Sequence, residues 1–366
     1  MFNPFDFFKK RSKSSLGVDI GTSSIKVVQL NKEEDKFELE TYGELSAKGY
    51  IEKLNDSFQT TSLKRMEAVT RELLSILLEK AEVTTRETVM SIPVFSSFVS
   101  VIEMPQMAEK ELEQAVEFEA KRYIPIPASE VVLDWKIIDS GMIKNGSSKQ
   151  AFKGRRIILI AVPKEVINKY ISMSEDLGLN INALELESFS LARSLIKDIN
   201  HSACILDVGA RATSFTIVDK GMVQMSHSLD IAGAEMTKRL SIGLNVSSGR
   251  AEDFKVEHGL NHAENSEGRE NIHELLKVPV DKIIDEINRM IKNYKGKTGR
   301  EIKELILNGG SARLVGLDEY IEDKINIKTV VANPWEGLVY PPSLQKYLKE
   351  IAPEFSVAVG AAMRKN

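Results

Sequence analysis

A short motif that occurs twice restricts the fold of this chain more than any other feature. Residues 16–26 read as a strand, a tight polar turn and a second strand, with Asp19 at the end of the first strand and Gly21 in the turn. Residues 205–215 repeat this skeleton, and both the aspartate and the glycine recur 188 positions later. A motif that is repeated across half a chain predicts two similar halves.

The two turns share a chemistry as well as a skeleton. A turn that directs several backbone N–H groups to one point forms an anion-binding concavity, and an acid beside it can hold a hydrated metal ion. Asp19 and Asp207 occupy that place in the two copies. One such turn per half predicts a nucleotide in the cleft between two domains. Each copy alone also fits an ordinary hairpin turn whose aspartate accepts hydrogen bonds from turn amides, but the duplication favours the nucleotide.

Length, charge and hydropathy exclude several classes of protein. The 366 residues predict two or three domains, and the net charge of −4 leaves no broad basic face for nucleic acid. No apolar run reaches the roughly 20 residues that span a bilayer, and no signal peptide is recognisable. The single cysteine, Cys204, lies in an apolar strand pattern, which is typical of a reducing compartment. These observations predict a cytoplasmic protein.

The first residues of the chain differ from the rest. Four phenylalanines within positions 2–8 precede a basic run at positions 9–13. One interpretation is a short element that docks on a membrane surface or on a partner. The other is a tail whose phenylalanines fold back on the body of the protein, and the sequence leaves both open.

Residues 95–187 interrupt the first half with a pattern of their own. Strands are expected at 98–104, 131–138, 157–162 and 182–186, and helices at 109–123 and 164–177. Residues 140–154, rich in Gly, Ser, Lys and Asn, are expected to form a long turn. This β-α-β-β-α-β order predicts a small α+β unit inserted before the second half.

Regular elements are also expected on both sides of this unit. In the first half, strands are expected at 37–42 and 88–93 and a helix at 64–80. In the second half, the expected elements are strands at 203–208 and 304–307, helices at 250–258, 280–294 and 355–363, and a helix that follows 308–311 through Leu314 and Leu317.

Five segments in order resemble the phosphate, connecting and adenosine motifs of the actin, sugar-kinase and heat-shock-chaperone ATPase superfamily. They are residues 16–26, 185–195, 205–215, 307–312 and 357–362. Residues 123–127, 132–135 and 186–193 further resemble PilM, the actin-like family of type IV pilus assembly in the FtsA-like branch. The resemblance implies an α/β, actin-like (ribonuclease-H-like) two-domain ATPase fold with an FtsA-type inserted subdomain.

The same resemblance implies how the chain divides. Residues 1–14 would be the tail, 15–96 with 186–200 the first actin-like domain, and 97–185 the inserted subdomain. Residues 201–245 with 303–366 would be the second actin-like domain, and 246–302 a smaller subdomain.

For the site, the resemblance implies ATP and Mg²⁺. The β- and γ-phosphates of ATP would lie against Gly21, Thr22, Ser23, Ser24 and Lys26 on one side and Gly209, Ala210 and Thr213 on the other. Asp19 and Asp207 would hold the Mg²⁺ through water.

The nucleoside would lie against residues of the second half. Glu252 and Lys255 share one face of a helix and would meet the ribose and the adenine edge. The alternative for this pair is a solvated salt bridge. Gly233, next to Ala232 where relatives often have a second glycine, would line the cleft. The adenine would lie against Gly309, Gly310 and Ser311, with Arg313 near the base.

Hydrolysis requires a group that orients a water molecule. Glu187 is the candidate, with Glu185 second, and turnover is expected to be slow. The alternative for either glutamate is an acid at a helix N-terminus that is stabilised by the helix dipole.

The resemblance also implies a partner and a location. The protein would act as a scaffold that docks the N-terminal cytoplasmic peptide of PilN, an inner-membrane protein, together with other inner-membrane pilus assembly proteins. It would be peripheral at the inner face of the membrane, with self-association open and no nucleic-acid partner. Three rival interpretations remain: an FtsA-like filament-forming cell-division ATPase, a small-molecule kinase, and a nucleotide-binding scaffold that never hydrolyses.

Overall fold

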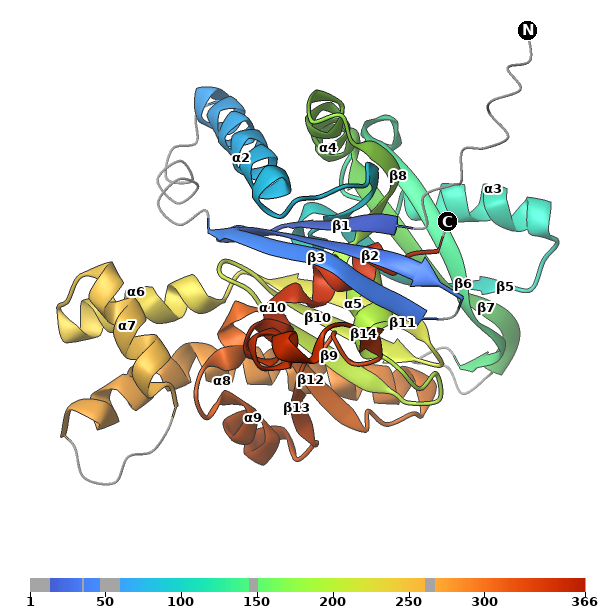
Figure 1. The fold of residues 1–366 in the computed structure, drawn as a ribbon. Coiled ribbons are helices and arrows are strands. Elements are labelled where there is room, and N and C mark those ends of the chain that lie inside the picture. Colours follow the sequence, from blue (N-terminus) through green and yellow to red (C-terminus); the bar gives the residue numbers. More distant parts are fainter. Residues whose placement is uncertain (1–13, 35, 47–59, 145–150, 261–266, 366) are drawn as a thin grey trace, which may run out of the picture.

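The computed structural model describes residues 14–34, 36–46, 60–144, 151–260 and 267–365. The aromatic and basic N-terminal tail, with its two interpretations, lies outside these residues. Within the described part, the chain forms two large sheets and one small inserted sheet (Figure 1).

The first sheet belongs mainly to the N-terminal half. Its strands are β1 (Ser14–Ile20), β2 (Ser24–Glu33), β3 (Lys36–Ser46), β4 (Glu87–Ile92), β8 (Asn180–Leu186) and β14 (Leu338–Val339). Their order is β14-β3-β2-β1-β4-β8. The pairs β1–β2 and β2–β3 are antiparallel, whereas β4 and β8 join in parallel. The first seven residues of β2 are all buried because helices cover both faces of this sheet.

The second sheet repeats this topology. Its strands are β9 (Ala203–Val208), β10 (Thr213–Asp219), β11 (Met222–Leu229), β12 (Glu304–Asn308) and β13 (Thr329–Val331). Their order is β11-β10-β9-β12-β13, again with three antiparallel strands followed by two parallel ones. The equivalence of β1 with β9 and of β4 with β12 confirms the two similar halves that the repeated motif predicts.

Helices cover both faces of the first sheet. On one face lie α2 (Thr60–Lys80) and α4 (Lys164–Asp176), where Leu74 and Met173 pack with Val18. On the other face lies α10 (Gln345–Ala362), whose Phe355 packs with Val28.

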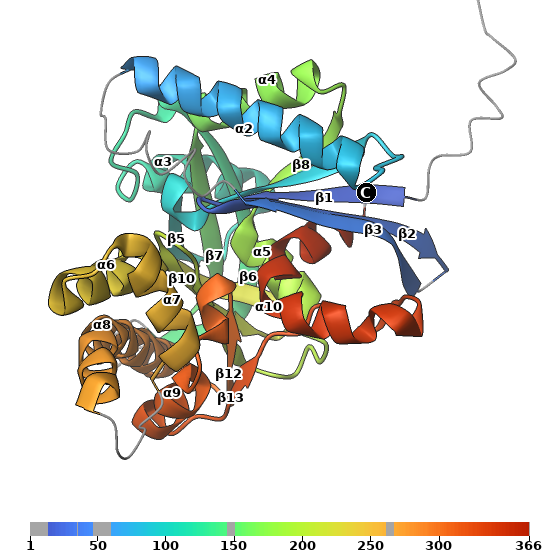
Figure 2. The ribbon, with the colours of Figure 1, turned by 60° about the vertical axis from the view of Figure 1, so that its left-hand side comes forward.

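Two helices run between the two large sheets. They are α5 (Glu187–Leu195) and α10, which lie side by side in Figure 2. A Cβ added to Gly360 would lie 1.9 Å from the carbonyl oxygen of Ser190, and one added to Gly17 would lie 2.0 Å from that of Ala358. Glycine at these two positions therefore lets the backbone of α10 touch both α5 and β1.

Four helices pack on the outer face of the second sheet. They are α6 (Gly233–Leu244), α7 (Ser248–His258), α8 (Glu267–Thr298) and α9 (Leu317–Ile325). Phe215 of the sheet is fully buried against Met236 of α6 and Leu276 and Ile287 of α8. The expected helices at 250–258 and 280–294 thus form, and the second is longer than predicted.

The inserted sheet consists of β5 (Phe98–Pro105), β6 (Val131–Lys144) and β7 (Ala151–Pro163), in the order β5-β7-β6. On one face, α3 (Glu109–Ala120) packs Leu112 against Ile102. On the other face, Ile138 and Ile158 join a core with Val223 of β11. The inserted sheet therefore interrupts the first half in sequence but packs against the second sheet in space.

The structure corrects the pairing predicted for the end of this unit. The strand expected at 182–186 is β8, which pairs in parallel with β4 and closes the first sheet. The helix α4 packs beside α2 on the first sheet, and its first turns also contact the inserted sheet, where Val166 and Ile167 share a core with Val162 of β7. The inserted sheet itself consequently ends at Pro163.

Three further predictions are wrong in extent. The turn expected at 140–154 is shorter, because β6 extends to Lys144 and β7 already begins at Ala151. After Asn308 the chain forms a short 3₁₀ turn, η4 (Gly310–Arg313), and α9 begins only at Leu317. The C-terminal helix begins at Gln345 instead of 355, with Pro353 inside it.

Candidate functional site

The two hairpin turns close in the same way. In the first, the backbone N–H of Gly21 donates to the carbonyl oxygen of Ser24 at 3.0 Å. In the second, the N–H of Gly209 donates to the carbonyl oxygen of Ala212 at 3.1 Å. A Cβ on either glycine would lie about 3 Å from that carbonyl oxygen, so the turns are as tight as the sequence predicts.

Asp19 lies at the end of β1, next to the first turn. The hydroxyl of Ser91 on β4 donates to its Oδ1 at 3.1 Å. Burial raises the pKa of Asp19, an effect that the nearby ammonium group of Lys26 and the Ser91 hydrogen bond oppose. The carboxylate is therefore held in a place where its negative charge is poorly solvated.

Asp207 is the equivalent residue at the end of β9. The side-chain amide of Asn308 donates from Nδ2 to its Oδ1 at 2.8 Å. The pKa of Asp207 is raised to about 6, first by burial and then by the charge of Asp19, while the Asn308 hydrogen bond and the charge of Lys26 oppose the rise. The two aspartates, far apart in sequence, thus share one electrostatic environment.

Glu187 is the first residue of α5 and belongs to the same cluster. Its Oε1 accepts a hydrogen bond from the backbone N–H of Val94 at 3.2 Å. Burial, and then the charges of Asp207 and Asp19, raise the pKa of Glu187 well above its usual value. The structure therefore brings this candidate for water orientation together with both aspartates.

Glu185, the second candidate for that role, is instead part of an ion-pair network. Arg193 forms two hydrogen bonds to it, at 2.6 and 2.8 Å, and Arg364 adds a third at 2.6 Å. Ser190 donates a fourth, at 2.6 Å. Burial would raise its pKa, but these partners together hold the pKa of Glu185 below its ordinary range. All its oxygens are engaged, so we assign this residue a structural role.

The predicted phosphate-binding residues of the first half lie in and beside the first turn. Thr22 and Ser23 form the turn itself, between β1 and β2. Lys26 is buried and pairs across the hairpin with Asp19. Its Nζ lies 2.6 Å from the hydroxyl of Ser24 and 3.5 Å from Glu44.

In the second half, the predicted phosphate-binding turn is tied to the start of α6. The N–H of Gly233 donates to the carbonyl oxygen of Gly209 at 3.1 Å, and that of Ala234 to Ala210 at 2.7 Å. The hydroxyl of Thr213 is buried and donates to the carbonyl oxygen of Ile231 at 2.6 Å. The hydroxyl of Thr213 is therefore used within the protein.

The predicted ribose pair, Glu252 and Lys255, projects from α7 toward α6. Nζ of Lys255 lies 2.8 Å from Oε2 of Glu252 and 2.9 Å from the hydroxyl of Thr237, which itself donates to Glu252 at 2.5 Å. Lys255 is buried and also donates to the carbonyl oxygen of Gly233 at 3.3 Å. The alternative of a solvated surface salt bridge is therefore excluded for the lysine.

The predicted adenosine segment borders the same place. Gly309 adopts a φ of +87°, and a Cβ there would lie 2.6 Å from Oδ1 of Asp207, so only glycine fits without a shift. The hydroxyl of Ser311 donates to the carbonyl oxygen of Gly209 at 3.4 Å. Gly310 opens η4, and Arg313 at its end pairs with Glu354 of α10 at 3.0 Å.

The donor set fits a hydrated magnesium ion. Asp19, Asp207 and Glu187 are oxygen donors. The charge of Asp19 raises the pKa of Asp207, and both aspartates raise the pKa of Glu187, so a divalent cation would relieve this repulsion. In the described part of the chain, no three His, Cys, Asp or Glu side chains gather closely enough to bind one metal directly. That Asp19 and Asp207 hold Mg²⁺ through water stays a prediction.

Sequence reasoning missed three residues of this region. Ser91 and Asn308 each hold one of the aspartates, and Thr237 connects Glu252 with Lys255. For the first two, the signal in the sequence is a single polar residue near the end of an apolar strand. That signal identifies a partner only once the neighbouring strand is known.

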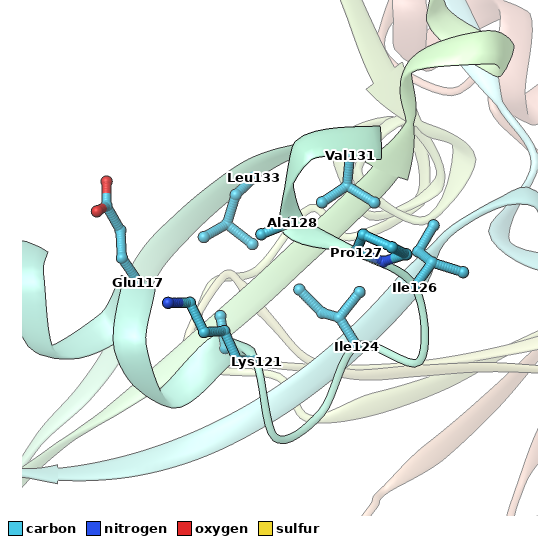
Figure 3. Close-up of a pocket in the computed structure, with 9 residues that line it drawn as sticks. Glu117, Lys121, Ile124, Ile126, Pro127, Ala128, Val131 and Leu133 are labelled. Carbon is cyan, nitrogen blue, oxygen red and sulfur yellow. The ribbon is translucent and has the colours of Figure 1, made fainter.

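A separate apolar pocket of about 300 Å³ lies in the inserted unit (Figure 3). Ile124 and Pro127, after the end of α3, face Val131 and Leu133 of β6 across it, and Lys121 borders it on the α3 side. A pocket of this size accommodates one large apolar side chain.

No helix in the described residues is long and apolar enough to cross a lipid bilayer.

Two sheets of one topology, two equivalent hairpins with their aspartates together, and two helices between the sheets define the actin-like class of ATPase folds. Solved structures of this class superpose on the chain. A chain of the "PilM-PilN type IV pilus biogenesis complex" has a TM-score of 0.78 and 24% identity, with 96% of this chain and 98% of that chain covered. MreB5 of Spiroplasma citri bound to ADP has a TM-score of 0.52 and 13% identity, with 95% of each chain covered.

Sequence comparison identifies the family. Residues 17–366 match the family described as type IV pilus assembly protein PilM, and the chain belongs to this family. Cell division protein FtsA of Enterococcus faecalis is 22% identical over 357 residues, which cover 87% of this chain and 78% of FtsA. The predicted PilM resemblance and the actin-like, FtsA-related fold are thereby confirmed.

Proposed function

We propose that this protein binds ATP with Mg²⁺ between its two halves and serves as an actin-like scaffold in type IV pilus assembly. The observation that carries the proposal is the meeting of Asp19, Asp207 and Glu187, which come from three separate segments. A cluster of buried acids beside two amide-rich turns is arranged for a metal-bound polyphosphate. Membership of the PilM family supports the role in pilus assembly.

In this proposal the phosphates lie between the two hairpins. Gly21, Thr22, Ser23, Ser24 and Lys26 contact them from the first half, and Gly209, Ala210 and Thr213 from the second. Lys26 supplies the positive charge. Because its hydroxyl is engaged with Ile231, Thr213 would contribute through its backbone.

The nucleoside would lie against the second half. Glu252 and Lys255 are already ordered by Thr237, which supports a preformed contact with the ribose and the adenine edge. Gly233 and the segment Gly309, Gly310 and Ser311 supply close-approaching backbone, with Arg313 at the edge.

We further propose that hydrolysis, if catalysed, is slow and that Glu187 orients the water. Burial and the charges of Asp207 and Asp19 raise the pKa of Glu187 well above its usual value, which disfavours the ionised form that a general base requires. Mg²⁺ bound nearby would favour its ionisation. Glu187→Gln should leave ATP affinity within about three-fold and abolish the residual turnover, measured by phosphate release.

The proposed partner is the N-terminal cytoplasmic peptide of PilN. The structural likeness to a chain of the PilM–PilN complex supports it. The pocket between α3 and β6 offers a place for an apolar side chain of an extended peptide on the inserted subdomain. Other inner-membrane pilus proteins would assemble around this contact, and the protein would be cytoplasmic and peripheral at the inner face of the membrane.

We keep the division into domains as part of this proposal. The first actin-like domain would comprise 15–96 with 186–200, the inserted subdomain 97–185, the second domain 201–245 with 303–366, and the smaller subdomain 246–302. The pairing of β8 with β4 supports moving the boundary of the inserted subdomain back to Pro163.

A second candidate function is an FtsA-like filament. The match to FtsA over most of the chain favours it. Electron microscopy of the purified chain with ATP and Mg²⁺ distinguishes the two functions, since a filament without any pilus protein would support self-assembly.

Calorimetry tests the main proposal. The purified chain and the Asp207→Ala variant are titrated with Mg²⁺–ATP, each with and without the PilN peptide. The proposal expects binding by the native chain, loss of binding by the variant, and a peptide affinity that changes with nucleotide. Absence of ATP binding by the native chain would refute the nucleotide site, and absence of peptide binding would refute the partner.

A further inference from the structure

Each aspartate of the site has a polar neighbour on the adjacent parallel strand. Ser91 of β4 donates to Oδ1 of Asp19 at 3.1 Å. Asn308 of β12 donates to Oδ1 of Asp207 at 2.8 Å. Both donors are 2% exposed, so neither contact is a chance encounter of surface side chains.

The two donors occupy equivalent places in the duplicated fold. Asn308 pairs with Asp207 in the parallel register of β12 and β9. In the first half, Met90 pairs with Val18 in the parallel register of β4 and β1, and Ser91 is the next residue beside Asp19. The same strand position thus supplies the donor in both halves, although one is a hydroxyl and the other an amide.

The contacts leave one oxygen of each aspartate available. On Asp207, Oδ1 is enclosed by the Asn308 amide and by Gly309, where an added Cβ would lie 2.6 Å from it. The hydrogen bonds found for the two carboxylates within the described residues all involve Oδ1. A hydrogen bond to one oxygen of a carboxylate fixes the direction in which the other oxygen points.

The side chain of Asn308 also carries an unfavourable feature. Its Oδ1 is buried and has no hydrogen-bond partner in the described part of the chain. A buried polar atom without a partner destabilises a protein, so its presence calls for an explanation. The hydrogen bond from its amide to Asp207 explains why an asparagine is kept at this position.

We infer that Ser91 and Asn308 are the positioning residues of the metal site, one per half. Each holds Oδ1 of its aspartate so that Oδ2 is presented to the water shell of Mg²⁺. The inference rests on the proposed Mg²⁺–ATP function and adds two residues that do not themselves touch nucleotide or metal.

The two positions should not contribute equally. An amide N–H of Asn308 has a fixed direction and donates over 2.8 Å. The hydroxyl of Ser91 has a single proton, which it shares between Asp19 at 3.1 Å and the carbonyl oxygen of Val18 at 3.4 Å. Asn308 therefore orients its aspartate more firmly than Ser91 does.

The test measures ATP binding to the full chain by calorimetry at a series of Mg²⁺ concentrations. The native protein is compared with Asn308→Ala and Ser91→Ala. The quantity compared is the Mg²⁺ concentration at which half of the Mg²⁺-dependent gain in ATP affinity is reached. A second series measures ATP affinity in EDTA, without Mg²⁺. Loss of a residue that orients a metal ligand weakens metal affinity by about 10- to 100-fold. We expect a rise of about ten-fold or more for Asn308→Ala, a smaller rise for Ser91→Ala, and unchanged ATP affinity in EDTA.

Conservative and matched variants separate positioning from general damage. Asn308→Ser, which restores the donor type of the first half, should recover part of the Mg²⁺ affinity. Thr88→Ala and Ser202→Ala remove buried hydroxyls that bond to backbone away from the aspartates, and should not change the Mg²⁺ requirement. Thermal unfolding without ligand checks that each variant folds.

The outcomes are distinct. If native protein shows Mg²⁺-dependent binding but Asn308→Ala has the same Mg²⁺ requirement, the positioning role is refuted and the proposed function stands. Equal losses of ATP affinity with Mg²⁺ and with EDTA also refute it, because a merely structural defect acts on both. If the native protein shows no Mg²⁺-dependent binding, the proposed function and this inference fail together.

Discussion

Arg364, just beyond the last helix, donates from Nη1 to Oε2 of Glu185 at 2.6 Å, across 179 residues of sequence. Glu185 also accepts two hydrogen bonds from Arg193, whose Nη1 reaches the carbonyl oxygen of Gly360. One buried carboxylate thereby connects β8, α5 and the end of α10. The network therefore ties the two helices that run between the sheets to the last strand of the first sheet.

Removing that carboxylate should destabilise the protein in a pH-dependent manner. Glu185→Gln leaves Arg193 without its charge partner, and we expect a loss of about 2 kcal/mol at pH 7. The pKa of Glu185 is lowered in the folded state, so its stabilisation is present above the usual carboxyl pKa and is lost as the pH falls through the folded value. Urea unfolding should show that the difference in free energy of unfolding between the native protein and Glu185→Gln is smaller at pH 3 than at pH 7. An equal difference at both values would contradict the assignment.

The contact between α10 and its neighbours should not tolerate a side chain. Gly17→Ala would place Cβ 2.0 Å from a backbone oxygen, and Gly360→Ala would place it at 1.9 Å. Backbone cannot move aside cheaply, so we expect a loss of about 3 kcal/mol or more for each. Gly296→Ala is the matched control, because nothing lies within 4 Å of that position in α8. Thermal unfolding should show a gain of about 0.5–1 kcal/mol for the control.

Asp207→Asn should stabilise the ligand-free chain while it removes Mg²⁺–ATP binding. The pKa of Asp207 is raised to about 6, mainly by burial, so ionisation of this group opposes folding. That unfavourable contribution is absent below about pH 4, grows between pH 4 and 6, and is complete above pH 6. We expect the variant to gain on the order of 1 kcal/mol at pH 7.5 and nothing at pH 4.

Denaturant unfolding between pH 4 and 8 measures this effect, and Asp230→Asn, at an exposed position, is the control. A variant that is less stable than the native chain at pH 7.5 would show that Asp207 is satisfied without metal.

The junction between the inserted sheet and the second sheet should depend on Asp219 more than on Asp139. Asp219 is 5% exposed and accepts hydrogen bonds from Tyr294 and Arg300, both at 2.5 Å. Asp139 of β6 meets the same Arg300 at 3.6 Å in a more exposed pair. We expect losses of about 2–3 kcal/mol for Asp219→Asn and below about 1 kcal/mol for Asp139→Asn.

Hydrogen exchange adds a local measurement at this junction. Amide protection in β6 should fall in Asp219→Asn because Arg300 then loses its anchor. Unchanged protection in β6, with the stability loss confined to α8, would indicate that Arg300 does not couple the two sheets.

The apolar pocket of the inserted unit should contribute to peptide binding. Leu133 lines the pocket, whereas its neighbour Val132 is 45% exposed and does not. Because successive strand residues face opposite sides, Leu133→Glu places a charge in the pocket and Val132→Glu does not. We expect a loss of PilN-peptide affinity of about ten-fold or more for the first, equivalent to about 1.4 kcal/mol, and little change for the second. Equal affinities in calorimetry would place the peptide elsewhere.

The sequence by itself determined the duplication, the fold class and the family resemblance. These depend on local patterns: the hairpin turn closes within four residues, from Gly21 to Ser24 and from Gly209 to Ala212. Turn chemistry and strand periodicity act over such short distances, so they can be predicted from neighbouring residues. Whether the predicted residues bind nucleotide stays a prediction.

Only the tertiary structure decided which strands and helices become neighbours. The pairing of β8 with β4, and of Asn308 with Asp207, joins residues some hundred positions apart, and no local pattern specifies such a register. Likewise, Pro353 suggests a helix boundary, yet it lies inside α10, where its carbonyl oxygen accepts a hydrogen bond from Gly309 at 2.9 Å. Burial against the first sheet outweighs the local preference of a proline, because packing energy is summed over a whole helix face.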